Sequence, residues 1–238
     1  MANVARAAAG AIRRRLPGAR PAPLGDNGDI AEVLARLLPA APVIVEAGAH
    51  NGADTLWLSR LRPKGTVHAF EPIPAVFDQL ARRTARCKNV RRYNLALSAA
   101  NGTATMHVSS GGSDASSSLH APKEHLRVNP HVLFEGTVEV PTLRLDDWAE
   151  QNRVGHADLL WLDMQGHELA AMQAGTRLLR TVSCIFTEVN LLEVYEGVPR
   201  YPEVRAWLEG QGFRVEREYF LYEDAGNVLF VRGGHGEG

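Results

Sequence analysis

The stretch from Val43 to Gly52 most constrains what this chain can fold into, because an apolar run ends there in an acid and then in glycines. Its first three residues, two of them valines around an isoleucine, predict a buried parallel strand that runs into a tight turn. Gly48 and Gly52 let the chain turn sharply and leave bare peptide for a ligand to lie against. The next run, Ala53 to Leu61, has the spacing of a helix whose first N–H groups would face that ligand. A turn without a ligand is the alternative.

A second acid indicates the kind of ligand. Gly65 to Phe70 predicts another strand, and Glu71 ends it roughly 20 residues after the first glycine, where an acid in a βαβ unit accepts hydrogen bonds from ribose hydroxyls. The spacing Glu46-x-Gly48-x-x-x-Gly52 lacks the second close glycine that lets a pyrophosphate approach. The pattern therefore favours a nucleoside without a pyrophosphate, and S-adenosylmethionine is the candidate.

Composition is compatible with one α/β domain in the cytoplasm. The 238 residues, 45% of them hydrophobic, can bury a full core, and the net charge of −1 gives no general attraction to nucleic acid. Cys87 and Cys184 lie far apart without a Cys-x-x-Cys pattern, which suits a reducing compartment. No apolar run approaches the ~20 residues of a membrane span. Residues 1–28 predict a basic helix and a linker, either a solvated tail or a contact for a membrane surface or a second subunit.

Strands and helices alternate along residues 29–232, which we expect to form a single domain before a flexible tail, 233–238. The predicted helices are 30–38, 53–61, 74–86, 167–174 and 202–210, and residues 146–148 open a further short helix. The predicted strands are 43–45, 65–70, 90–95, 137–145, 158–162, 182–187, 213–220 and 228–231. The last two strands are close enough to pair antiparallel. The pattern predicts a doubly wound, Rossmann-like α/β sheet of about seven mostly parallel strands with a terminal antiparallel hairpin.

Residues 102–142 interrupt this alternation and predict an insertion. Asn101-Gly102 is a hairpin signal between Leu95–Leu97 and Ala104–Val108. The serine- and glycine-rich segment 109–119 follows, with no strong periodicity up to Gly136, so that it is either a lid over the site or disordered. It is followed by His120, Lys123 and His125.

Four stretches, in this order, resemble the FkbM family of class I S-adenosylmethionine-dependent methyltransferases. They are Glu46-Ala-Gly-Ala-His-Asn-Gly52, Phe70-Glu71-Pro72, Asn94-Leu-Ala-Leu-Ser98 with Asn101-Gly102, and Leu162-Asp-Met-Gln-Gly-His-Glu168. The resemblance implies that the first stretch holds the methionine part of the cofactor, Glu71 the ribose, and the third stretch the adenine. The implied cofactor-binding residues are Glu46, Gly48, His50, Asn51, Gly52, Glu71, Asn94, Ala96, Ser98 and Asp163. The chain departs from the family pattern at Glu46, His50 and Gln165, where the family usually has Asp, Asn and Glu.

Methyl transfer needs orientation and, for a hydroxyl acceptor, a base. Asp163, at the end of one predicted strand, His167 just after it, and Glu188, at the end of the next strand, are the candidate catalytic residues. His50, His120 and His125 are other candidate bases, although any of these histidines could be an ordinary surface residue. Asp163 and Glu188, with Glu168 or His167, could also hold a divalent ion, but we favour a site without metal.

The resemblance implies O-methylation of a hydroxyl on a sugar-containing or polyketide-like small molecule. N-methylation of a small molecule, which needs no strong base, and an inactive nucleoside-binding module remain as alternatives. A nucleic-acid substrate is disfavoured, because the chain has no basic stripe with interleaved aromatic residues.

Overall fold

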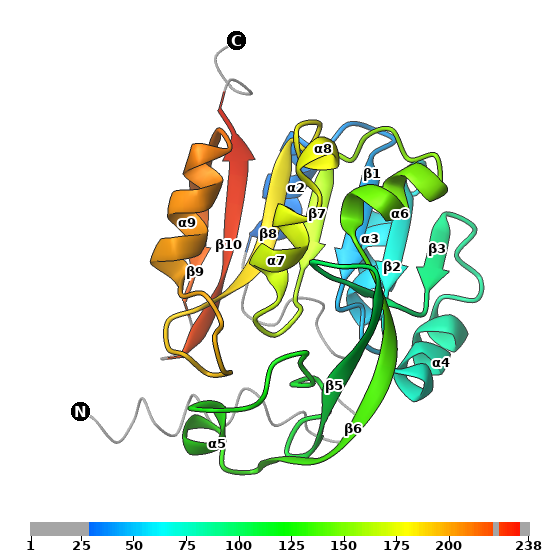
Figure 1. Cartoon of the computed structure of the whole chain (residues 1–238). Helices are drawn as coiled ribbons and strands as arrows, with labels where there is room; N and C mark the ends of the chain where they lie inside the picture. Colours follow the sequence, from blue (N-terminus) through cyan, green and yellow to red (C-terminus); the bar gives the residue numbers. More distant parts are fainter. Residues whose placement is uncertain (1–28, 221–223, 234–238) are drawn as a thin grey trace.

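A computed structural model of the chain describes residues 29–220 and 224–233. The predictions for residues 1–28 and 234–238 lie outside this part. Figure 1 shows a central sheet with helices on both faces and a long hairpin beyond one end of the strands. In the described part, no helix has both the length and the apolar character needed to cross a membrane.

The main sheet has seven strands in the described part of the chain. They are β1 (Val43–Ala47), β2 (Thr66–Phe70), β3 (Val90–Tyr93), β7 (Leu159–Leu162), β8 (Cys184–Asn190), β9 (Phe213–Tyr219) and β10 (Ala225–Arg232), in the order β3-β2-β1-β7-β8-β10-β9. The neighbours from β3 to β8 are parallel, whereas β10 is antiparallel to both β8 and β9. The predicted sheet and its terminal antiparallel pair are confirmed.

Helices cover both faces of this sheet (Figure 1). These helices are α2 (Ile30–Leu37), α3 (Ala53–Leu61), α4 (Pro74–Arg83), α6 (Leu145–Gln151), α7 (Glu168–Gln173), α8 (Thr176–Leu179) and α9 (Tyr201–Gly210), whereas α5 (His125–Val128) lies in the insertion. Ile44 packs in the core beneath α2, α3 and α4, while the next residue, Val45, packs in the core beneath α6 to α9. Because both faces are covered, the central strands are continuous apolar runs rather than alternating ones.

A second, three-stranded sheet holds the insertion. It contains β4 (Ala96–Leu97), β5 (Gly102–Gly111) and β6 (Val132–Leu143), in the order β4-β6-β5. β6 pairs antiparallel with β5 and parallel with β4. The hairpin predicted between Leu95–Leu97 and Ala104–Val108 is therefore wrong, since β4 and β5 pair with β6 and not with each other.

Asn101 explains the wrong hairpin. Its side-chain oxygen accepts the backbone N–H of Arg144 at 2.7 Å, and its side-chain nitrogen donates to Asp147 at 2.7 Å. Both partners lie more than 40 residues away, at the start of α6. The residue thus ties the second sheet to a helix instead of forming a two-residue turn.

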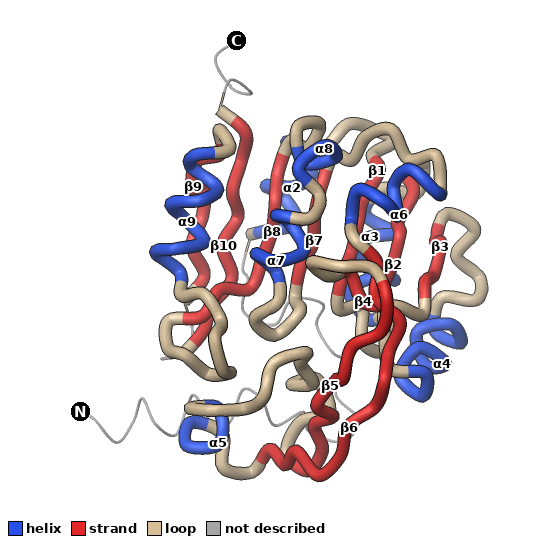
Figure 2. Tube along the Cα trace, viewed as in Figure 1, coloured by secondary structure: helices blue, strands red, loops and turns tan. Residues whose placement is uncertain are grey.

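The chain between β5 and β6 folds back toward the main sheet, and Figure 2 shows it mostly as loop. Ser118 exchanges two backbone hydrogen bonds with His107 of β5, at 2.8 and 3.1 Å. The N–H groups of Lys123 and His125 both donate to the carbonyl oxygen of Val194, each at 2.9 Å. These contacts hold the segment in place, and its role as a lid stays a prediction.

The end of β8 differs from its prediction. Glu188 was expected to end this strand, but β8 continues to Asn190, and Glu188 pairs with Asn227 of β10. The extension depends on an antiparallel partner about 40 residues away in the chain. Glu46 likewise lies within β1, one residue before its end.

Trp148 provides a test of the core. Its side chain is fully buried, and the rings of His68, Phe70 and Tyr93 lie with their centroids 5.0 to 5.5 Å from its own. We expect Trp148→Ala to lower the free energy of unfolding by about 3–5 kcal/mol, because it leaves a large cavity. Urea unfolding followed by circular dichroism measures this. Leu126→Ala, at a residue 49% exposed, is the control, and an equal loss in both variants would contradict the assignment.

Candidate active site

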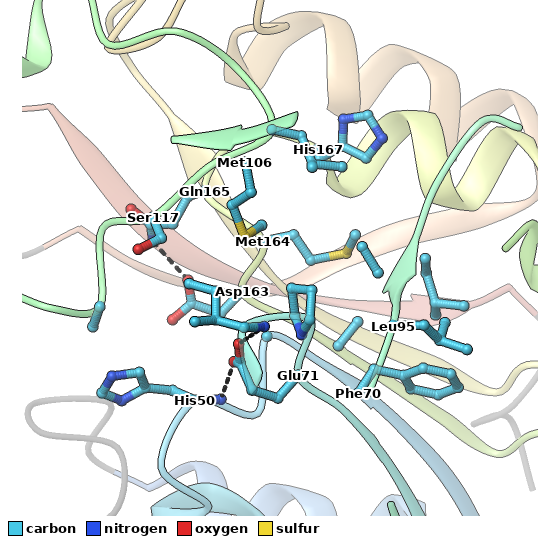
Figure 3. Close-up of a pocket in the computed structure, with 18 of the residues that line it drawn as sticks. His50, Phe70, Glu71, Leu95, Met106, Ser117, Asp163, Met164, Gln165 and His167 are labelled. Atoms are coloured by element: carbon cyan, nitrogen blue, oxygen red, sulfur yellow. Dashed lines mark hydrogen bonds between the residues drawn. The ribbon is translucent and has the colours of Figure 1, made fainter. Parts of the chain in front are cut away.

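The ends of three central strands meet at one pocket (Figure 3). β1 contributes Ala47 and is followed by Gly48, β2 is followed by Glu71, and β7 is followed by Asp163 and Met164. Parallel strands bring their carboxyl ends to the same edge of a sheet, which is where ligands bind in open α/β folds. The empty space in this pocket and at its open mouth amounts to about 570 Å³.

The insertion forms another wall of this pocket. Asp114, Ala115, Ser117 and Leu119 line it from the segment between β5 and β6, and Met106 lines it from β5. Met106 and Leu119 also pack with Ala96 and Ile73 in a small apolar cluster. This part of the wall is therefore apolar, and it suits the flat face of a base better than it suits a charged group.

Position 48 requires glycine, both because of its backbone conformation and because of the atoms that surround it. Its φ is +85°, and a Cβ atom there would lie 1.7 Å from the carbonyl oxygen of Asp163. The Gly48 N–H donates to the carbonyl of Phe70 at 3.1 Å, and the Asp163 N–H donates to that of Ala47 at 3.0 Å. The turn after β1 thus lies directly against the turn after β7, and its bare peptide forms part of the pocket.

Glu71 is held by backbone N–H groups. Its two carboxylate oxygens accept hydrogen bonds from His50, at 3.0 Å, and from Ile73, at 2.8 Å (Figure 3). Asn94 stabilises the turn after Glu71 by donating to the carbonyls of Glu71 and Pro72, both at 2.9 Å. Burial raises the pKa of Glu71 to about 7, although the two N–H groups act in the opposite direction. Each oxygen keeps a further lone pair for a ribose hydroxyl.

Glu46 occupies a different environment from Glu71. It is 1% exposed and is not among the residues that line the pocket, and its Oε2 has no hydrogen-bond partner in the described part of the chain. Burial raises its pKa to about 8, which Thr55 of α3 only partly offsets. Contact between Glu46 and the cofactor therefore stays a prediction.

An amide joins the two predicted catalytic acids. The side-chain nitrogen of Gln165 donates to Asp163 at 2.8 Å and to Glu188 at 2.7 Å. Asp163 lines the pocket, whereas Glu188 does not. The hydroxyl of Tyr195 lies 2.9 Å from the side-chain oxygen of Gln165. Within residues 29–220 and 224–233, no three histidine, cysteine or acidic side chains gather in a way that could hold a metal ion.

His167 lies between two hydrogen-bonding side chains. Its Nε2 is 3.0 Å from the Ser98 hydroxyl, and its Nδ1 is 3.0 Å from Nε2 of His120 in the insertion. Burial, and next the charge of His120, lowers the pKa of His167 to about 4, and burial lowers the pKa of His120 as well. Both imidazoles are therefore neutral at pH 7. In the view of Figure 3, His167 and His50 lie at opposite ends of the pocket, with Asp163 and Met164 between them.

The pocket brings together only part of the predicted set. Gly48, His50, Glu71, Ala96, Asp163 and His167 line it, while Glu46, Asn51, Gly52, Asn94, Ser98 and Glu188 do not. Sequence reasoning missed Gln165 as a bridge, and it missed the contact of His120 with His167. The two histidines are 47 residues apart in the chain, so no local pattern relates them.

The doubly wound sheet, the bare peptide at Gly48 and the fixed acid at Glu71 define a class I S-adenosylmethionine-dependent methyltransferase. The chain matches the methyltransferase FkbM domain over residues 46–215, and it belongs to this family. Its methyl donor is S-adenosylmethionine, and the chemistry of the pocket residues suits this cofactor, with a carboxylate at Glu71 and apolar side chains at Ala96 and Met106.

Named relatives and solved structures agree with this class. The chain is 33% identical over 171 residues to 2-O-methyltransferase NoeI of Sinorhizobium fredii, which covers 70% of each chain. It is 26% identical over 168 residues to hexuronic acid methyltransferase AglP of Haloferax volcanii, covering 68% of this chain and 62% of the other. The N-terminal domain of EvdMO1, crystallised in the presence of SAH and D-fucose, superposes with a TM-score of 0.51 at 14% identity, covering 92% and 88% of the two chains. At that identity the last match supports the fold alone.

Glu71 provides a test of cofactor binding. We expect Glu71→Ala to weaken the binding of S-adenosylhomocysteine about 10- to 100-fold, because hydrogen bonds to a charged group contribute about 1.5–3 kcal/mol. Titration calorimetry on the purified protein measures the change. Glu203→Ala, on the surface of α9, serves as the control. Unchanged affinity in the Glu71 variant would remove Glu71 from the ribose site.

Glu46 provides a test of pH dependence. The folded chain holds the Glu46 proton up to a pKa of about 8, whereas the unfolded chain releases it near the ordinary value of 4.5. The folded state binds more protons in this window, so Glu46 lowers stability progressively as the pH rises from 4.5 to 8. We therefore expect the free energy of unfolding of Glu46→Gln, relative to that of the wild type, to be higher at pH 8 than at pH 5. Urea unfolding at the two pH values measures this difference. The same difference at both pH values would contradict a buried, protonated Glu46.

Proposed function

We propose that this enzyme methylates a hydroxyl group of a sugar-containing or polyketide-like small molecule. The observation that carries the proposal is the environment of His167: a neutral imidazole lines the cofactor pocket, and its Nε2 already contacts a hydroxyl, that of Ser98, at 3.0 Å. A hydroxyl acceptor has a high pKa and needs a base, whereas an amine acceptor does not. A base of this kind in the pocket favours O-methylation over N-methylation.

Residues at the ends of the strands are proposed to position the cofactor. In the proposed arrangement the bare peptide at Gly48 lies against its methionine part, Glu71 accepts the ribose hydroxyls, and Ala96 with Met106 packs against its base. S-adenosylmethionine supplies an electrophilic methyl group when bound. Asp163, at the end of β7, is proposed to orient the groups that react, with Glu188 supporting it through Gln165. In-line transfer depends mainly on such positioning.

His167 is the proposed base. The bound cofactor would supply the methyl group, and its sulfur would keep the electron pair of the carbon–sulfur bond that breaks. As the acceptor oxygen bonds to the methyl carbon, its O–H bond breaks and the proton moves to Nε2 of His167. The lowered pKa of His167, about 4, keeps the ring neutral at neutral pH, so that one of its two nitrogens carries no proton and can accept one. The same shift makes His167 a weak base if it acts alone, so its neighbours matter.

Sugars are the proposed acceptor class. NoeI is named as a 2-O-methyltransferase and AglP as a hexuronic acid methyltransferase, and both are relatives of this chain. The lid also supplies polar groups at the pocket, among them the hydroxyl of Ser117 and the carboxylate of Asp114. Such groups can hydrogen-bond a polyol. We propose a small-molecule acceptor rather than a nucleic acid, and a cytoplasmic enzyme that can form a homo-oligomer.

A methyl-transfer assay tests the proposal. The protein is incubated with S-adenosylmethionine and, separately, with methyl glycosides of neutral hexoses and of hexuronic acids, with matched amino sugars, and with hydroxylated polyketides. Release of S-adenosylhomocysteine and mass spectrometry of the acceptor are the readouts. We expect O-methylated products. Turnover of the amines alone would contradict O-methylation.

His167→Gln tests the base. We expect kcat to fall about 10²- to 10⁴-fold, the usual contribution of general acid–base catalysis, with the affinity for S-adenosylhomocysteine unchanged. His156→Gln is the control, because His156 is largely exposed and pairs with Asp158 outside the pocket. A His167 variant that keeps full kcat would transfer the role of base to another group.

A further inference from the structure

Four groups form one continuous line of hydrogen bonds across the insertion and the sheet edge. The Ser98 hydroxyl is 3.0 Å from Nε2 of His167, Nδ1 of His167 is 3.0 Å from Nε2 of His120, and Nδ1 of His120 is 3.1 Å from the carbonyl oxygen of Glu196. They come from four separate parts of the chain: the residue after β4, the start of α7, the insertion, and the loop before α9. His120 itself does not line the pocket and reaches it only through His167.

The carbonyl at the end of this line sets its direction. A carbonyl oxygen can only accept, so Nδ1 of His120 carries a hydrogen and, in the neutral ring, Nε2 of His120 carries none. Nε2 of His120 must then accept from Nδ1–H of His167. The second nitrogen of His167, Nε2, is left as an acceptor, and the Ser98 hydroxyl donates to it.

The position of His120 complements that of His167. Burial and the neighbouring His120 make a charged His167 unfavourable, and they lower its pKa to about 4. His120 is partly exposed, lies on the lid side of the pair, and donates to a backbone carbonyl that favours its charged form. His107 is the other titratable group that opposes charge on His120. His120 is therefore placed, by its contact with Nδ1 of His167 and its own hydrogen bond to Glu196, to take up a proton from His167.

We propose that His120 and His167 form a two-histidine proton relay, in which the lid residue His120 orients the catalytic imidazole and receives its second proton. The inference rests on the proposed O-methylation. The bound donor would supply the methyl group, and its sulfur would keep the electron pair of the carbon–sulfur bond that breaks. When the acceptor oxygen bonds to the methyl carbon, the O–H bond breaks and its proton bonds to Nε2 of His167, the Nδ1–H bond of His167 breaks, and that proton bonds to Nε2 of His120. His167 ends neutral and His120 ends as the cation, with its Nδ1–H still on Glu196. The acceptor hydroxyl takes the contact with Nε2 that Ser98 makes in this structure.

The tautomer of His167 provides a test that needs neither acceptor nor turnover. Proton–nitrogen correlation spectra of the cofactor-free protein, with isotopically labelled histidine at pH 7.5, distinguish a ring protonated at Nδ1 from one protonated at Nε2. We expect Nδ1–H for both His120 and His167, with assignments from His120→Gln and His167→Gln. A wild-type His167 protonated at Nε2 would overturn the relay.

Three variants separate orientation from proton transfer. Gln at position 120 can place a carbonyl oxygen where Nε2 of His120 lies, so His120→Gln keeps Nδ1–H on His167 but cannot take the proton. His120→Phe offers no acceptor, so His167 turns to Nε2–H and donates to Ser98. Ser98→Ala is the matched control. We expect it to leave the tautomer of His167 unchanged, because the carbonyl of Glu196, and not Ser98, sets the direction of the hydrogen bonds. Loss of Nδ1–H in Ser98→Ala would contradict this order.

Kinetics with the best methyl glycoside complete the test. We expect kcat to fall about 10²- to 10⁴-fold in His120→Phe and about tenfold in His120→Gln, with the affinity for S-adenosylhomocysteine unchanged in both. Wild-type kcat in His120→Gln would overturn proton transfer to His120. Different measurements decide the proposed O-methylation and the proposed relay. Absence of O-methylation by the wild type contradicts the proposed function, whereas the tautomers of His167 in the wild type and in His120→Phe decide the arrangement of the relay by themselves.

Discussion

The contact between the turns after β1 and β7 is the constraint on which the site depends. A Cβ atom at position 48 would lie 1.7 Å from the carbonyl oxygen of Asp163, so only glycine lets these two turns approach. The contact continues the parallel pairing of β1 and β7 past the last strand residues, through the N–H of Asp163 on the carbonyl of Ala47. The acid of one strand end and the bare peptide of the next thereby share one pocket.

Most of the main sheet could be predicted from the sequence, because its signals are local. A β-branched run such as Val43–Val45, followed by glycines and a helical period, specifies strand, turn and helix within about 20 residues. Trp148 and Trp161, which lie on elements predicted from the sequence, are both buried. Errors appear where the deciding partner is distant: Asn101 binds residues near 144–147 instead of forming a hairpin, and β8 passes Glu188 because β10 pairs with it.

The same distinction applies to the site. Gly48, Glu71 and Asp163 follow strands directly, and His167 lies at the end of the turn after β7, so a strand assignment also predicts that they meet. Glu46 has the same kind of signal but faces a helix, since neighbouring residues of a strand point to opposite faces of the sheet. His120 has no such signal at all. Its position depends on how the segment between β5 and β6 folds back, and that path is set by backbone hydrogen bonds to His107 and Val194.

This folding back gives the insertion two roles at once. The hydrogen bond from the Ser118 hydroxyl to the carbonyl of Gln165, at 2.7 Å, attaches the segment beside the turn that carries His167. One residue farther along, Leu119 closes the apolar side of the pocket, and the next residue, His120, reaches the imidazole. Closure of the pocket and alignment of the proposed base therefore depend on the same few residues. A movement of the segment that opened the pocket would also separate the two histidines, so the base is aligned only when the pocket is closed.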